Sequence, residues 1–186
     1  SPVPARCGSW TVFEDREAAM GRTIDLHVVV VPAKARLAEP DPVFILAGGP
    51  GQAATELIRA VVSRLDKVRE KRDIVFVDQR GTGRSNGLQC SFGEDADLEQ
   101  ALSTDLMERT LVEACRESLD ADLTLYTTPI AMDDLNDVRA ALGYAQINLY
   151  GGSYGTRAGL VFLRRHGENV RTAILDGVAP PDMALP

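Results

Sequence analysis

The sequence predicts an α/β fold, with a mostly parallel sheet and helices on both faces. Apolar runs at residues 43–47 and 73–78 flank an amphipathic segment at 54–71, which is the order of a β-α-β unit. Continuous apolar runs of this length are typical of parallel strands that are buried on both faces. A third apolar run, at 147–150, leads through glycines into a helical pattern at 156–166. These alternations indicate one α/β layer structure.

The remaining elements fit around this unit. Residues 9–13 and 23–31 are expected to form an antiparallel strand pair that opens the sheet, and 170–175 to form its last strand. The acidic stretch 94–119 is expected to be largely helical, and 130–142 to be a helix that begins near Pro129. Residues 1–186 are expected to belong to a single domain, without an internal repeat or linker.

Composition excludes several classes of protein. The chain has 186 residues, 45% of them hydrophobic and 25% charged, with a net charge of −7. Acidic and basic residues are interspersed, so no basic patch favours nucleic acid as a partner. The apolar runs, including those at 28–31 and 43–47, are far too short to span a bilayer. The chain opens on Ser1-Pro2-Val3-Pro4 without a signal peptide, which is typical of a mature or trimmed chain.

The three cysteines, Cys7, Cys90 and Cys115, show no zinc-ligand spacing, and the sequence indicates neither a metal nor a cofactor. Cys90 and Cys115 enclose a segment that would suit a disulfide in an exported protein. Three reduced thiols are the equal alternative, and Cys7 is left over in both cases.

A candidate nucleophile lies in the stretch Gly-Gly-Ser-Tyr-Gly at 151–155. A strand, then Gly-x-Ser-x-Gly, then a helix is the order of a nucleophile elbow, which makes Ser153 the candidate catalytic residue. The serine would need two N–H donors for the oxyanion that forms when it attacks a carbonyl. The Tyr154 amide is one, and the glycine loop after residues 43–47 offers Gly49 as the other, with Gly48 as the alternative.

The three glycine loops, LAGGPG at 46–51, DQRGTGRS at 78–85 and GGSYGT at 151–156, together resemble the α/β-hydrolase superfamily. With the opening CGSWTVFEDR and the closing LDGVAPP, the chain is most similar to its proline iminopeptidase and secreted tripeptidyl aminopeptidase branch. The resemblance implies that residues 1–186 are the N-terminal portion of an α/β-hydrolase catalytic domain. It also implies a secreted or periplasmic serine aminopeptidase that acts on peptide N-termini. It implies the roles given above for Ser153, Tyr154 and Gly49, and it favours a Cys90–Cys115 disulfide.

A catalytic serine needs a histidine base that is oriented by a carboxylate. Neither histidine of the sequence is expected to fill this role. His166 lies thirteen residues after Ser153 on one helical run, about 20 Å away at 1.5 Å per residue. His27 precedes the serine on an early strand, and Asp176 is more typical of a turn than of a triad acid. The resemblance implies that a helical cap and the last strands, with acid and histidine, would follow near Pro186. A second polypeptide, a longer chain or an inactive product would each account for this.

Other functions remain open at this point. An esterase or thioesterase would use the same elbow on a small ester, and a binding protein could keep the shape without turnover. The segment from Gly49 to Ala54 also fits G-x-G-x-x-A after a strand, with Asp78 ending the next strand, as in dinucleotide-binding proteins. That interpretation leaves the stretch at 151–155 unexplained.

Overall fold

The described part of the chain, residues 3–90 and 109–182 of a computed structural model, contains a six-stranded sheet in the order β1-β2-β4-β3-β5-β6. The strands β3, β4, β5 and β6 run parallel, and β2 pairs antiparallel with β1 and β4. The mostly parallel sheet and its antiparallel opening pair are therefore confirmed. The strands are β1 (Arg6–Phe13), β2 (Thr23–Val31), β3 (Val43–Leu46), β4 (Ile74–Val77), β5 (Ile147–Gly152) and β6 (Val170–Asp176).

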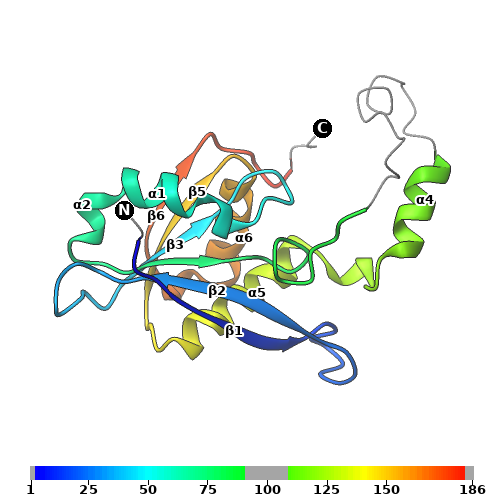
Figure 1. The fold of residues 1–186 in the computed structure, drawn as a ribbon, viewed down its shortest axis with the longest axis horizontal. Helices are drawn as coiled ribbons and strands as arrows, with labels where there is room; N and C mark the ends of the chain where they lie inside the picture. The colour runs from blue at the N-terminus through cyan, green and yellow to red at the C-terminus, as the bar shows by residue number, and fades with distance from the viewer. Residues whose placement is uncertain (1–2, 91–108, 183–186) are drawn as a thin grey trace. The chain divides into compact units, whose positions relative to one another are not determined.

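Helices cover both faces of this sheet, as Figure 1 shows for α1 and α5 on opposite sides. One face packs on η1 (Ala54–Leu57), α1 (Ile58–Arg64) and α2 (Asp66–Arg69). The other packs on α5 (Thr128–Ala141) and α6 (Tyr154–His166), which a short η3 (Gly167–Asn169) follows. Each face has its own apolar cluster, because strand residues alternate between the two faces.

The prediction of a single continuous helix over 54–71 is wrong. The segment is divided into η1, α1 and α2, and Leu65 leaves the α-helical conformation with φ −96° and ψ 23°. No glycine or proline marks this break, so the sequence carries no signal for it. The apolar stripe survives the division, and all six of its members pack on the core: Leu57, Ile58, Val61, Val62, Leu65 and Val68.

Residues 88–123 form a compact unit of their own, apart from the unit of residues 1–87 and 124–186. The smaller unit holds α4 (Arg109–Ser118), and η2 (Leu123–Leu125) lies at its end. The helix expected over 94–119 is confirmed in α4, and its first part lies outside the described residues. Cys90 and Cys115 form a disulfide with their Cα atoms 5.4 Å apart, whereas Cys7 is a free, exposed thiol.

Among the described residues, no helix combines the length and the apolar character needed to span a membrane.

Candidate active site

Ser153 lies at the junction between β5 and α6, where the chain turns from strand to helix. Its backbone has φ 52° and ψ −123°, a conformation that residues other than glycine seldom adopt. The residue is exposed, although the strand before it and the helix after it are largely buried. A positive φ at a serine between a parallel strand and a helix is the strained turn expected of a nucleophile elbow.

The glycines on either side of Ser153 are required by close backbone contacts. A β-carbon at Gly151 would lie 2.4 Å from the carbonyl oxygen of Gly155. A β-carbon at Gly155 would lie 2.1 Å from the carbonyl oxygen of Leu46 at the end of β3. Gly152, in contrast, has no heavy atom within 4 Å of that position. Gly151 and Gly155 therefore let the turn pass against α6 and β3.

A buried threonine ties the elbow to the chain that leaves β6, and sequence reasoning missed it. The Thr156 hydroxyl donates to the carbonyl of Ser153 at 2.6 Å and accepts from the amide of Ala179 at 2.8 Å. The amide of Ser153 donates to the carbonyl of Asp176 at 2.9 Å. The position of Thr156, directly after the motif in the first turn of α6, is the signal that could have identified it.

The glycine loop after β3 lies directly beside the serine. A β-carbon at Gly48 would lie 3.6 Å from the Ser153 β-carbon and 3.6 Å from the carbonyl oxygen of Gly152. Gly49 has φ +102°, in the region that favours glycine. Tyr154 begins α6, and the first N–H groups of a helix have no partner within the helix and carry its positive dipole end. The backbone next to Ser153 can therefore accommodate an anion.

An open cleft of about 500 Å³ extends from Ser153 along η1 and α1. Its walls combine apolar side chains with Gln52, Arg64 and Asp176. Arg64 donates from Nη1 to the Tyr150 hydroxyl at 3.3 Å. The apolar lining comes from β3, η1, α1 and β5: Ile45, Leu46, Leu57, Ala60, Val61 and Tyr150. The cleft offers room for a substrate next to the serine.

Asp78 lies inside the protein, directly after β4. Its side chain is fully buried and accepts hydrogen bonds from the amide and the hydroxyl of Thr55, at 2.9 Å and 3.0 Å. Its Oδ2 also accepts from the Arg84 amide at 3.3 Å. A carboxylate enclosed in this way cannot reach a ribose hydroxyl, so the dinucleotide-binding interpretation loses its acidic residue.

The glycine loop at 78–85 contains an arginine that is buried inside the protein. Arg80 is 4% exposed, and its Nε and Nη2 donate to the two carboxylate oxygens of Asp134 at 2.6 Å and 3.0 Å. Its Nη1 donates to the carbonyls of Glu14 and Leu125. Burial, together with the hydrogen bond to Glu14, raises the pKa of the neighbouring Tyr126 to about 12. Arg80 therefore joins separate segments of the chain.

The structure places neither histidine near the serine. His166 is at the far end of α6, where its Nε2 lies 2.8 Å from Oδ1 of Asp133. His27 is on β2, separated from β5 by β4 and β3, which corresponds to roughly 14 Å at a strand spacing of about 4.8 Å. Asp176 is exposed and lines the cleft with Ser153, but neither histidine joins it there.

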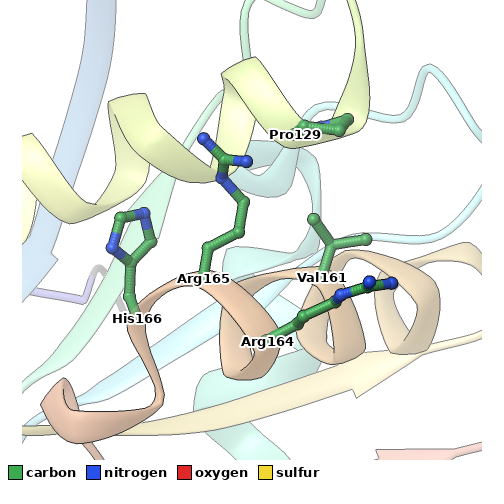
Figure 2. Close-up of a pocket in the computed structure, with 5 residues that line it drawn as sticks. All are labelled: Pro129, Val161, Arg164, Arg165 and His166. Atoms are coloured by element: carbon green, nitrogen blue, oxygen red, sulfur yellow. The ribbon is translucent and has the colours of Figure 1, made fainter.

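A cavity of about 610 Å³ lies on the other side of α6, between this helix and the start of α5. Figure 2 shows Arg165 and His166 extending from α6 towards α5, where both bind Asp133. Pro129, Val161 and Arg164 complete its lining. These side chains include no nucleophile. Within residues 3–90 and 109–182, no group of three or more histidine, cysteine, aspartate or glutamate side chains is placed to hold a metal ion.

Comparison with known proteins gives the same picture of the fold. The chain is 30% identical to the tripeptidyl aminopeptidase of Streptomyces coelicolor over 97% of its own length, and 28% identical to the serine protease Hip1 of Mycobacterium tuberculosis over the same share. It aligns with the crystal structure of the proline iminopeptidase of Mycobacterium smegmatis with a TM-score of 0.56 and 21% identity, covering 89% of this chain and 42% of that one.

The alignments cover 36% of the Streptomyces protein and 37% of the Mycobacterium protein, so the chain spans little more than a third of these relatives. The sequence model of the alpha/beta hydrolase fold matches residues 41–186, which include all three glycine loops and β3 to β6. The chain belongs to the alpha/beta hydrolase family.

Proposed function

We propose that this chain carries the nucleophile and the oxyanion hole of a serine aminopeptidase, which releases residues or short peptides from peptide N-termini. The observation that carries the proposal is Ser153, exposed at positive φ between β5 and α6 and next to the Gly48 loop. The names of the relatives, two aminopeptidases and a serine protease, support peptides as the substrate class.

The proposed chemistry is acyl transfer. Ser153 Oγ attacks the scissile carbonyl, its proton passes to a histidine, and the carbonyl electrons move to the oxygen, which accepts from the amides of Gly49 and Tyr154. Collapse of this intermediate expels the amine, which takes the proton from the histidine. The acyl group is then on Ser153, and water releases it by the reverse proton path.

We place the histidine and the triad acid outside this chain, on a second polypeptide or on further residues of a longer one. His27 and His166 are both remote from Ser153 in the sheet and helix geometry. The hydrolase order, with serine first, acid second and histidine last, agrees with this placement. Asp176 lines the cleft without a histidine partner there, so it is not assigned as the acid.

We also propose a secreted or periplasmic location. The Cys90–Cys115 disulfide supports it, because disulfides persist in oxidising compartments. The test is the mass of the protein alkylated with and without prior reduction. An oxidised pair in protein from its native host supports export, and two free thiols contradict it.

The test of function is labelling with a fluorophosphonate, followed by intact-mass spectrometry of the full-length protein and any copurifying polypeptide. A single adduct on Ser153, absent in Ser153→Ala, is the expected result. Aminoacyl arylamides and small esters are then compared, and turnover of the esters alone would assign an esterase or thioesterase. No adduct on a folded protein would contradict a catalytic role and favour a binding function.

A further inference from the structure

The loop that carries the proposed oxyanion donor Gly49 is connected by a hydrogen bond to a buried carboxylate. This loop, residues 47–53, runs from the end of β3 to η1, and Gly49 and Gly51 both have positive φ, +102° and +103°. Glycine backbones have a wide choice of conformations, so contacts elsewhere must select the one that aims the Gly49 amide. At its start, β3 holds the loop, because β3 is paired on both sides with β4 and β5.

At its other end the loop is held through Thr55. Both the amide and the hydroxyl of Thr55 donate to the Asp78 carboxylate, one to each oxygen, at 2.9 Å and 3.0 Å. Two hydrogen bonds from one residue to the two oxygens of a carboxylate fix position and orientation together. Asp78 is itself immobile, since its amide donates to the carbonyl of His27 at 3.0 Å and its side chain is fully buried.

The loop at 79–85 closes over the same carboxylate. The Arg84 amide donates to Asp78 Oδ2, and a β-carbon at Gly83 would lie 2.4 Å from this oxygen. The same β-carbon would lie 2.7 Å from the β-carbon of Ala53, the last residue of the glycine loop. Two of the three glycine loops therefore meet at Asp78, away from the surface that a substrate can touch.

We propose that Asp78 and Thr55 are positioning residues, which hold loop 47–53 so that the Gly49 amide faces the developing oxyanion. This inference rests on the proposed serine hydrolase function. Neither residue lines the cleft beside Ser153, so their effect on the reaction passes through the loop. Removing an oxyanion donor typically costs about 10²- to 10³-fold in kcat, and a misaimed donor is expected to cost part of that.

The test is Thr55→Val in the full-length protein, with Thr55→Ser as the variant that restores the hydroxyl. We expect kcat to fall by roughly tenfold in Thr55→Val with KM within about twofold, and Thr55→Ser to stay near the parent, since only the transition state uses the oxyanion hole fully. Asp78→Asn, which turns one acceptor into a donor, should lower kcat further. Thr11→Val is the matched control, because it removes another Thr–Asp hydrogen bond, the one from Thr11 to Asp25 on the exposed β1–β2 pair.

A second measurement separates positioning from general stability. A peptidyl trifluoromethyl ketone forms a hemiketal oxyanion with the serine, so its Ki should rise in Thr55→Val by the factor by which kcat/KM falls. Hydrogen exchange of residues 47–53 should accelerate in the same variant. Unchanged kcat and Ki in a folded Thr55→Val protein would overturn the inference. If the parent protein shows no Ser153-dependent activity, the proposed function fails. The connection between the loop and Asp78 is tested separately, because unchanged hydrogen exchange of residues 47–53 in Thr55→Val would refute it.

Discussion

Two regions near the carboxyl ends of the strands hold their backbone in opposite ways. At the elbow, Ser153 is fixed by close backbone contacts at Gly151 and Gly155 and by the neutral hydroxyl of Thr156. At the other region, a buried ion pair with two hydrogen bonds joins Arg80 to Asp134, and Arg16 adds a third hydrogen bond to the same carboxylate at 2.9 Å. One region relies on backbone fit and neutral hydrogen bonds, and the other on charge.

The difference follows from what each region must hold in place. At Ser153 the turn must pass close to β3 and α6, and glycines allow this approach. The Arg80 cluster serves no reacting atom and must join the end of β1, η2 and α5. An arginine suits this task, because its five donors can bind a carboxylate and several carbonyls at once.

The largest expected effect comes from Arg80→Met in the full-length protein. The substitution removes the bidentate partner of the Asp134 carboxylate, which is 2% exposed, and Arg16 keeps a single hydrogen bond to it. Removing one partner of a buried pair costs about 3–5 kcal/mol in the free energy of unfolding. Denaturant titration measures this, and Arg36→Met on the exposed surface is the matched control, with a change within about 0.5 kcal/mol.

The double variant Arg80→Met with Asp134→Leu sharpens this result. It removes both charges, so a large part of the lost stability should return, as is found when apolar side chains replace buried ion pairs. A loss below about 1 kcal/mol in Arg80→Met alone would contradict the view that charge holds this region.

The elbow is expected to be destabilised by added side-chain volume, not by the loss of a charge. Gly155→Ala places a β-carbon 2.1 Å from the Leu46 carbonyl oxygen, which forces α6 away from β3. Overpacking of this kind costs roughly 1–3 kcal/mol and should also displace Ser153, with loss of labelling by a fluorophosphonate. Gly152→Ala, one residue before the serine, meets no atom within 4 Å and should change the free energy of unfolding by less than about 0.5 kcal/mol. Equal losses in both variants would contradict this account.

The sequence predicts the elements that have a local apolar periodicity. The strands around 43–47 and 147–150, the helix at 156–166 and the stripe of residues from Leu57 to Val68 are confirmed, because apolar periodicity reports burial directly. The division of the helix at Leu65 could not be predicted, because no breaker residue marks it.

In the candidate site, too, local patterns predict some features and not others. The elbow turn at Ser153 follows from the local order of strand, glycines and helix, and the structure has that turn. Its roles in catalysis, with those of Gly49 and Tyr154, stay predictions. Thr156, and the link between Asp78 and Thr55, join residues 23 positions apart in the chain. Hydrogen bonds of such separation leave no periodic trace in a single sequence. The place of Thr156 directly after the motif could mark that residue, but local patterns reveal neither its partner Ala179 nor the link between Asp78 and Thr55.

The smallest effect is expected from Asp133, which joins α5 to α6 next to Asp134 in the chain. Burial alone would raise the pKa of Asp133, but hydrogen bonds from Arg165 and His166 outweigh it and lower this pKa below its usual value. A lowered pKa means that the folded protein holds the carboxylate more strongly than the unfolded chain does. The stabilisation is therefore fully present above the unfolded pKa of about 3.9 and is lost as pH falls through the folded value.

Unfolding free energies of Asp133→Asn and the parent protein, measured between about pH 6 and pH 2, test this prediction. The variant should be less stable at pH 6 and should approach the parent at the acid end, since both then lack the carboxylate charge. The destabilisation by Gly155→Ala should stay constant over the same range, because it removes no titratable group. If the Asp133→Asn difference is equally constant, charge does not hold the contact between α5 and α6, and this end of α6 is fixed by fit, as the elbow is.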